Sequence, residues 1–190
     1  MPTFDQYRDE VREAILLRDG EALINGSIEH AGIITQEALI NAQDSVRILS
    51  YRLDPDCYAD EAVLNAADYF LANPSHHLKI LIEAGLWNDG NYDWTRHPLI
   101  HKLHQSLTQQ NPNFEIRLVP KALAEKYAYN FLVLDDYGYR YEEDRKRPTA
   151  VARFLPIDDP KKEPVVNLTN IFDSIWEGSE PLDLNKKKAA

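Results

Sequence analysis

The chain has 190 residues and a formal net charge of -10, and Cys57 is its single cysteine. This length is enough for one domain with a sizeable hydrophobic core. The overall field of so acidic a protein does not attract nucleic acid or an anionic membrane, so we expect neither as a partner. One cysteine allows no internal disulfide, which fits the cytoplasm, and no apolar run approaches the roughly 20 residues of a membrane span.

Helical and strand-like patterns alternate along most of the chain. They predict, in chain order, a helix at 3–18, a helix at 27–42, a strand at 45–54, a helix at 60–73, a strand at 77–85, a helix at 98–110, strands at 114–120, 130–136, 139–143 and 149–155, and a helix at 167–178. This order predicts a single-domain α/β sandwich with a mixed β-sheet. We expect an N-terminal helix and lead-in at 1–26, the domain at 27–182 and a disordered tail at 183–190.

Four stretches of the chain follow one another in a pattern known from one protein family. They read ALINAQDSVRILSYRLDPD (38–56), LKILIEAG (78–85), FEIRLVP (114–120) and AYNFLVLDD (128–136). Together they resemble one half of the phospholipase D superfamily fold. The catalytic strand of that family reads His-x-Lys-x4-Asp. With Asp135 at the Asp position, Ala128 takes the place of the His and Asn130 that of the Lys.

The resemblance implies that the family's reaction is lost on this strand. In the family a His attacks phosphorus, a second His protonates the leaving group, and the Lys stabilises phosphoryl charge. Ala128 has no lone pair and Asn130 has no charge, so we expect a pseudo-enzyme. The resemblance is to bacterial members of the superfamily that lack the catalytic residues. It implies that this chain is bacterial and is a binding or regulatory module that acts through a protein partner or a small polar ligand. A single half in one chain implies a homodimer.

A polar cluster follows the strand at 130–136, and it supplies our candidates for a ligand site. The candidates are Asp135, Tyr139, Arg140, Tyr141 and Arg153, with Asp54 and Glu83 from neighbouring strand ends. We expect them to hold a small polar or phosphorylated ligand, or a basic loop of a partner. The competing interpretation is a solvated hairpin, because Glu142, Glu143 and Asp144 alternate with the basic residues and predict salt bridges. The chain has no P-loop and no dinucleotide glycine pattern, so we expect no cofactor.

The alternative function is a phosphodiesterase or nuclease with a rearranged site, with or without a metal. It would use Asp135, Tyr139 and one histidine of the stretch HPLIHKLH, which contains His97, His101 and His104. Pro98 stands where the known zinc signature has a Glu, so a His at a helix start is the competing interpretation. The aromatic loop at 87–94 is a further candidate, as a ligand site or as packing.

Overall fold

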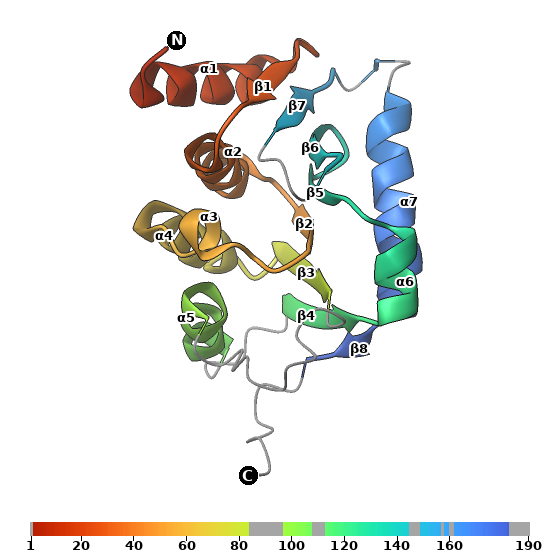
Figure 1. The fold of residues 1–190 in the computed structure, drawn as a ribbon. Coiled ribbons are helices and arrows are strands. Elements are labelled where there is room, and N and C mark those ends of the chain that lie inside the picture. Colours follow the sequence, from red (N-terminus) through yellow and green to blue (C-terminus); the bar gives the residue numbers. More distant parts are fainter. Residues whose placement is uncertain are drawn as a thin grey trace.

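The computed structural model describes residues 2–83, 97–107, 113–144, 149–156, 158–159 and 162–182, with residues 104–107 by their backbone only. These residues form one eight-stranded sheet with helices on both faces (Figure 1). The strands are β1 (Leu23–Asn25), β2 (Ser45–Ser50), β3 (His77–Glu83), β4 (Phe114–Val119), β5 (Asn130–Leu134), β6 (Gly138–Glu142), β7 (Ala150–Phe154) and β8 (Glu180–Pro181). The helices are α1 (Phe4–Leu17), α2 (Ile28–Asn41), α3 (Pro55–Tyr58), α4 (Glu61–Leu71), α5 (Pro98–Leu107), α6 (Lys121–Lys126) and α7 (Glu163–Glu177).

The strand order in the sheet is β1-β7-β6-β5-β2-β3-β4-β8. Strands β2, β3 and β4 run parallel to one another, whereas every other pair of neighbours is antiparallel. The expected α/β fold with a mixed sheet is therefore confirmed. Strand β5 joins the two parts of the sheet, because it pairs with the parallel strands through β2 and with the antiparallel hairpin of β6 and β7 through β6.

Two hydrophobic layers sandwich the sheet, because successive side chains of a strand point to opposite faces. Ile48 and Ile80 belong to the layer formed with α1 to α5. Leu49 and Leu81 belong to the layer on the other face, where they join Phe172 of α7. In Figure 1, helices α1 to α5 lie on one side of the sheet, and α6 and α7 lie on the other. The parity of a strand residue therefore decides which side of the molecule its side chain can reach.

Helix α1 packs on the domain through Tyr7, Val11 and Ile15, which are all buried. Its start is fixed by a capping box, in which the Gln6 backbone N–H donates to Thr3 Oγ1 and the Thr3 N–H donates to Gln6 Oε1. Arg12 of this helix binds the buried Glu37 of α2 through two hydrogen bonds of 3.1 and 2.9 Å. Helix α1 is thus tied to the core by both apolar contacts and an ion pair.

The predicted strands all appear, with ends shifted by a few residues, and four short elements are additional: β1, α3, α6 and β8. These have two to six residues, which is too short for a periodic pattern to show. Within the described ranges, no helix has both the length and the apolar character needed to cross a membrane.

Candidate binding site at the junction of β2 and β5

A cavity of about 300 Å³ lies where the end of β2 meets the start of β5. Its walls come from α2, the segment after β2, α3, β5 and β6. Ser50, Tyr58, Asn130, Arg140 and Glu142 are among its lining residues. The antiparallel pairing of β2 with β5 brings together the C-terminal end of one strand and the N-terminal end of the other. The cavity therefore opens at the end of the sheet where ligands bind in many α/β proteins.

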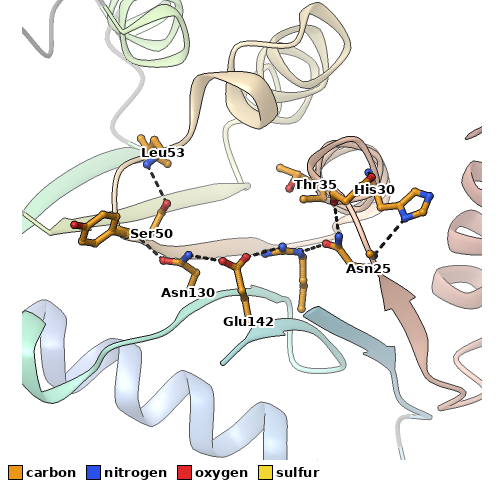
Figure 2. Close-up of polar contacts among 12 residues, drawn as sticks. Asn25, His30, Thr35, Ser50, Leu53, Asn130 and Glu142 are labelled. Atoms are coloured by element: carbon orange, nitrogen blue, oxygen red, sulfur yellow. Dashed lines mark hydrogen bonds and ion pairs between the residues drawn. The ribbon is translucent and has the colours of Figure 1, made fainter. Parts of the chain in front are cut away.

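Asn130 joins the loop after β2 to strand β6. Its Oδ1 accepts a hydrogen bond of 2.8 Å from the Tyr51 backbone N–H. Its Nδ2 donates a hydrogen bond of 3.0 Å to Glu142 Oε1. Figure 2 shows Asn130 beside Glu142, with Ser50 on the neighbouring strand. A neutral amide, which both accepts and donates, can make this link, whereas a lysine has no acceptor.

Arg140 continues the chain of hydrogen bonds on the same face of β6. Its Nη2 donates to Glu142 Oε2 at 2.8 Å and its Nε donates to Asn25 Oδ1 at 2.6 Å. Asn25 in turn donates at 2.6 Å to the carbonyl oxygen of Ser27, next to the start of α2. Arg140, Glu142 and Asn25 are 7%, 8% and 0% exposed. Each charge is thus both paired and hydrogen-bonded, as a buried ion pair requires.

Several donors of the cavity remain available to a ligand. Arg140 Nη1 makes no hydrogen bond to any described residue, and the second N–H of the Asn130 amide has no acceptor among those residues. Ser50 Oγ accepts from the Leu53 N–H at 3.0 Å, which leaves its own proton free for donation. Burial raises the pKa of Tyr58 far above its ordinary value, so its hydroxyl keeps its proton. These groups favour a ligand that is rich in acceptor oxygens.

Two further residues that line the cavity are Asp54, a capping carboxylate, and Cys57, a buried thiol. Asp54 caps α3 by accepting the Asp56 N–H at 3.1 Å, and it also pairs with Arg52. Cys57 is 3% exposed, and burial raises its pKa to about 12. A thiol that stays protonated is a poor nucleophile. No histidine is among the described residues that line the cavity.

The two positions that the resemblance aligns with the His and Lys of the phospholipase D pattern lie at this end of β5. Ala128 is exposed, just before the strand begins, and Asn130 is its first residue and lines the cavity. Of the predicted site residues, Arg140 and Asp54 also line this cavity. The expected hairpin salt bridge is present as the pair of Arg140 and Glu142.

Asp135 lies at the other end of β5, about 16 Å from Asn130 at the usual rise of a strand. Its carboxylate accepts hydrogen bonds from the backbone N–H groups of Gln43, Asp44 and Ser45, at 2.9, 2.9 and 2.7 Å. Its own backbone is left-handed, with φ of 47°. The structure does not bring Asp135 together with Arg140, and its carboxylate holds the turn before β2.

The remaining predicted site residues lie on the opposite face of the sheet. Tyr139 and Tyr141 alternate with Arg140 along β6, so their side chains face the α7 side. Arg153 pairs with Tyr139 across β6 and β7. Glu83 is fully buried and follows Ile82, which faces α1 to α5, so it also points to the α7 side. The predicted site residues thus lie in three places: at the cavity, at the far end of β5 and on the α7 side of the sheet. Alternation along the strands accounts for the change of face, and the length of β5 accounts for the distance of Asp135.

His97 has a structural contact at the start of α5. It is 1% exposed, and its Nε2 donates to the carbonyl oxygen of Leu53 at 2.7 Å. Burial lowers its pKa. His101 is exposed on α5, and the side chain of His104 and the loop at 87–94 lie outside the described residues. In the part of the chain that the structure describes, no three His, Cys, Asp or Glu residues are placed to hold a metal ion.

Among the residues that line this cavity or hydrogen-bond to its lining, the prediction missed Asn25, Ser50, Tyr58 and Glu142 as site residues. Asn25 lies in a strand of three residues, whose sequence carries no visible period. Glu142 did carry a signal, because its spacing of two from Arg140 places both side chains on one face of a strand. Ser50 ends a predicted strand, but no pattern around it distinguishes it from other serines.

Solved structures share this fold at low sequence identity. The first is TrmBL2, "an archaeal chromatin protein" whose structure "shows a novel mode of DNA binding": 16% identity, TM-score 0.57, with 94% of this chain and 62% of that one covered. NucT from Helicobacter pylori matches at 12% identity and TM-score 0.56, over 86% of this chain and 99% of that one. Phosphatidylserine synthase from Haemophilus influenzae Rd KW20 matches at 11% identity and TM-score 0.54, over 85% of this chain and 39% of that one.

The structural matches support a phospholipase D-like fold for this chain. This chain spans less than two thirds of TrmBL2 and of the synthase. No curated protein matches the sequence.

One prediction is corrected by these matches. The net charge of -10 argues against nucleic acid as a partner. A DNA-binding chromatin protein nevertheless shares this fold over 94% of the present chain. The exclusion is wrong because net charge sums over the whole surface. Nucleic acid is bound by a local surface, and charges more than about 10 Å away are screened by salt.

The family comparison covers most of the chain. One family model matches residues 27–185, from the start of α2 to just beyond β8. By this match, the chain belongs to the family described as "Domain of unknown function (DUF7931)".

Proposed function

We propose that this phospholipase D-like domain is catalytically inactive and binds a small phosphorylated ligand in the cavity between β2 and β5, as a binding or regulatory module. The observation that carries the proposal is the position of Asn130. By the resemblance, Asn130 stands at the position of the lysine of the phospholipase D superfamily, and its amide is hydrogen-bonded to the Tyr51 N–H and to Glu142. A residue held in this way helps to shape a pocket and supplies no charge to a transition state.

The loss of reaction follows from the chemistry of the lining residues. Phosphodiester transfer through a covalent intermediate needs an imidazole nucleophile, a proton donor and a charged group near the phosphoryl oxygens. Ala128 offers no nucleophile, and Cys57, with a pKa raised to about 12, stays protonated. Arg140 is paired with Glu142 at 2.8 Å, so it offers a bound group a hydrogen-bond donor and little net charge.

Binding of a phosphorylated ligand is supported by the donors that line the cavity. Arg140 Nη1, the hydroxyls of Ser50 and Tyr58, and one amide N–H of Asn130 are all available. Because Arg140 and Tyr58 are buried, they are already ordered and little entropy is lost when they bind a ligand. A volume of about 300 Å³ suits a phosphate group with a small substituent.

Two assays on one purified sample test the proposal. We expect no hydrolysis of bis-p-nitrophenyl phosphate, and we expect calorimetric titration to detect binding of inorganic phosphate or adenosine monophosphate. Tyr58→Phe and Ser50→Ala should each weaken that binding about three- to tenfold, since each removes one donor. Tyr69→Phe is the matched control, because Tyr69 is 68% exposed and does not line the cavity. Turnover by the purified chain, or equal affinity of the three variants, would refute the proposal.

A second candidate function is DNA binding, which is favoured by the fold that the chain shares with TrmBL2. Fluorescence anisotropy with a labelled DNA duplex tests it, at about 50 and about 200 mM salt because phosphate contacts weaken steeply with salt. Salt-dependent binding supports this function. Competition by free phosphate would assign the contact to the cavity, and its absence would assign the contact to another surface.

A further inference from the structure

A second cavity lies on the other face of the sheet, away from the site between β2 and β5. It has a volume of about 540 Å³. The loop between α1 and β1 lines it on one side, strands β6 and β7 form its floor, and the start of α7 closes it. No described residue that lines it also lines the cavity between β2 and β5. Its chemistry can therefore be considered separately from the proposed function.

The loop that borders this cavity is fixed to β7 at Gly20. The Gly20 N–H donates to the carbonyl oxygen of Phe154 at 2.9 Å, and the Gly20 carbonyl accepts from Arg153 Nη1 at 2.9 Å. A Cβ placed on Gly20 would lie 3.8 Å from Asp159 Oδ2, so the segment after β7 also meets the loop here. The cavity is therefore built from segments held together by hydrogen bonds and close contact.

Carboxylates dominate the charge of this cavity. Among the described residues that line it, Asp19, Glu21, Asp159 and Glu163 stand with a single cation, Arg153. In the described ranges, no group of three such side chains is close enough together to hold a metal ion. Carboxylates that are spread around about 540 Å³ suit a larger cation, whose charge several of them can share at a distance.

Tyr139 provides an independent sign of a ligand in the floor of the cavity. It is 8% exposed, and its hydroxyl makes no hydrogen bond to any described residue. The described polar atoms that are both buried and unpaired do not include this hydroxyl, so the hydroxyl is accessible from the cavity and can hydrogen-bond to a ligand there. Burial raises the pKa of Tyr139, so the oxygen stays neutral and can accept an N–H, and its aromatic ring can face a cation.

Glu163 has a structural role as well, because it stands in the first turn of α7, where a negative charge is stabilised by the helix dipole. That interaction offsets part of the attraction of Glu163 for a cation. Glu21 lies outside any helix and has no such compensation. Glu21 should therefore contribute more to the affinity than Glu163 does.

We infer that the cavity between the α1–β1 loop and the start of α7 binds an organic cation with a primary ammonium group. Such a group arises from a free polyamine or from a lysine side chain of a partner protein. In either case the ammonium would lie among the carboxylates and donate a hydrogen bond to Tyr139.

Calorimetric titration of the full chain tests this inference, with spermidine and the blocked peptide acetyl-Lys-Lys-Lys-amide as probes at about 20 mM salt. We expect a Kd below about 1 mM for at least one probe. The double variant Glu21→Gln/Glu163→Gln should weaken it about tenfold or more, and Tyr139→Phe about threefold. The matched control is Glu10→Gln/Glu13→Gln, which removes the same charge from the exposed face of α1.

Thermal melting followed by circular dichroism checks that each variant is folded. Tighter binding of the peptide would identify a lysine side chain as the source, and tighter binding of spermidine a free polyamine. Both results support the inference. It would be overturned by the absence of binding to both probes, or by a control that weakens binding as much as the cavity variant does, because the attraction would then be diffuse.

Discussion

The two ends of strand β5 have opposite characters. At one end, Asp135 receives three backbone N–H groups and holds the turn before β2. At the other end, Ala128 is exposed and Asn130 lines a cavity. If Asp135 is aligned with the Asp of the phospholipase D superfamily pattern, the first end has the pattern's residue, and the second end has Ala128 and Asn130 in place of His and Lys. On that alignment, one short motif combines a residue that holds the fold with positions that can change without loss of the fold.

The contrast has a physical basis in what each side chain satisfies. The Asp135 carboxylate is the acceptor for Gln43, Asp44 and Ser45, and the Asp135 N–H donates to the Ser45 carbonyl at 2.8 Å. Charge-assisted hydrogen bonds of this kind contribute more than neutral ones. Position 128 satisfies nothing comparable, because an exposed alanine makes no side-chain hydrogen bond.

The largest expected effect is therefore at the Asp135 end. Asp135→Ala removes the acceptor of three N–H groups, and we expect the free energy of unfolding to fall by about 4 kcal/mol. Urea denaturation followed by fluorescence measures this change. Asp135→Asn should lower the free energy of unfolding by about half as much, because Asn tolerates the left-handed backbone and keeps one acceptor oxygen.

The neighbouring Asp136 is the control for this experiment. Its side chain is 80% exposed and pairs only with Lys162, at 3.1 Å, among the described residues. An exposed ion pair contributes at most about 1 kcal/mol, so Asp136→Ala should be nearly neutral. Equal losses for Asp135→Ala and Asp136→Ala would contradict the structural role of Asp135.

The next effect is at the cavity end, where Arg140 and Glu142 form a buried pair. Arg140→Met leaves the Glu142 carboxylate buried without its cation, and we expect a loss of about 3 kcal/mol. The double variant Arg140→Met/Glu142→Met should recover about half of that loss, because no uncompensated charge then remains. Urea denaturation of the wild type, Arg140→Met, Glu142→Met and the double variant gives the coupling energy. A double variant that is less stable than Arg140→Met would show that the pair does not act as a unit.

Much of the fold is predictable from local patterns, and the site is predictable only in part. Strands β3 and β5 are rich in apolar residues, with few polar ones between them, so the sequence marks them well. The grouping of Asn25 with Arg140 depends on a contact over 115 positions, which no local pattern encodes. We expected Asp135 in a ligand site, whereas it binds three backbone N–H groups. The local sequence around a carboxylate at a strand end does not distinguish these two roles.

A pH experiment gives a smaller effect and tests the loop that borders the cavity between β2 and β5. Burial lowers the pKa of His97 in the folded chain below the ordinary value of 6.5. Below pH 6.5 the unfolded chain therefore binds a proton that the folded chain does not, so stability falls as the pH decreases. The loss is at most about 1.4 kcal/mol for each pH unit.

Denaturation at pH 7.5, 6.5 and 5.5 measures this effect. His97→Gln cannot be protonated and keeps an N–H donor for the Leu53 carbonyl, so its stability should change less over this interval. A wild-type curve with the same slope as that of His97→Gln would contradict the assignment.

The smallest expected effect is at position 128, and it contrasts with position 130. Ala128→His places an imidazole on an exposed site and should change the free energy of unfolding by less than about 0.5 kcal/mol. Asn130→Lys should lose about 1.5 kcal/mol, since a lysine cannot accept the Tyr51 N–H that Asn130 accepts at 2.8 Å. If these two costs are found, the hydrogen bond from the Tyr51 N–H disfavours the superfamily's lysine at position 130, whereas position 128 tolerates its histidine. The fold would then have adapted to the change at position 130, whereas position 128 would remain open to the family's residue.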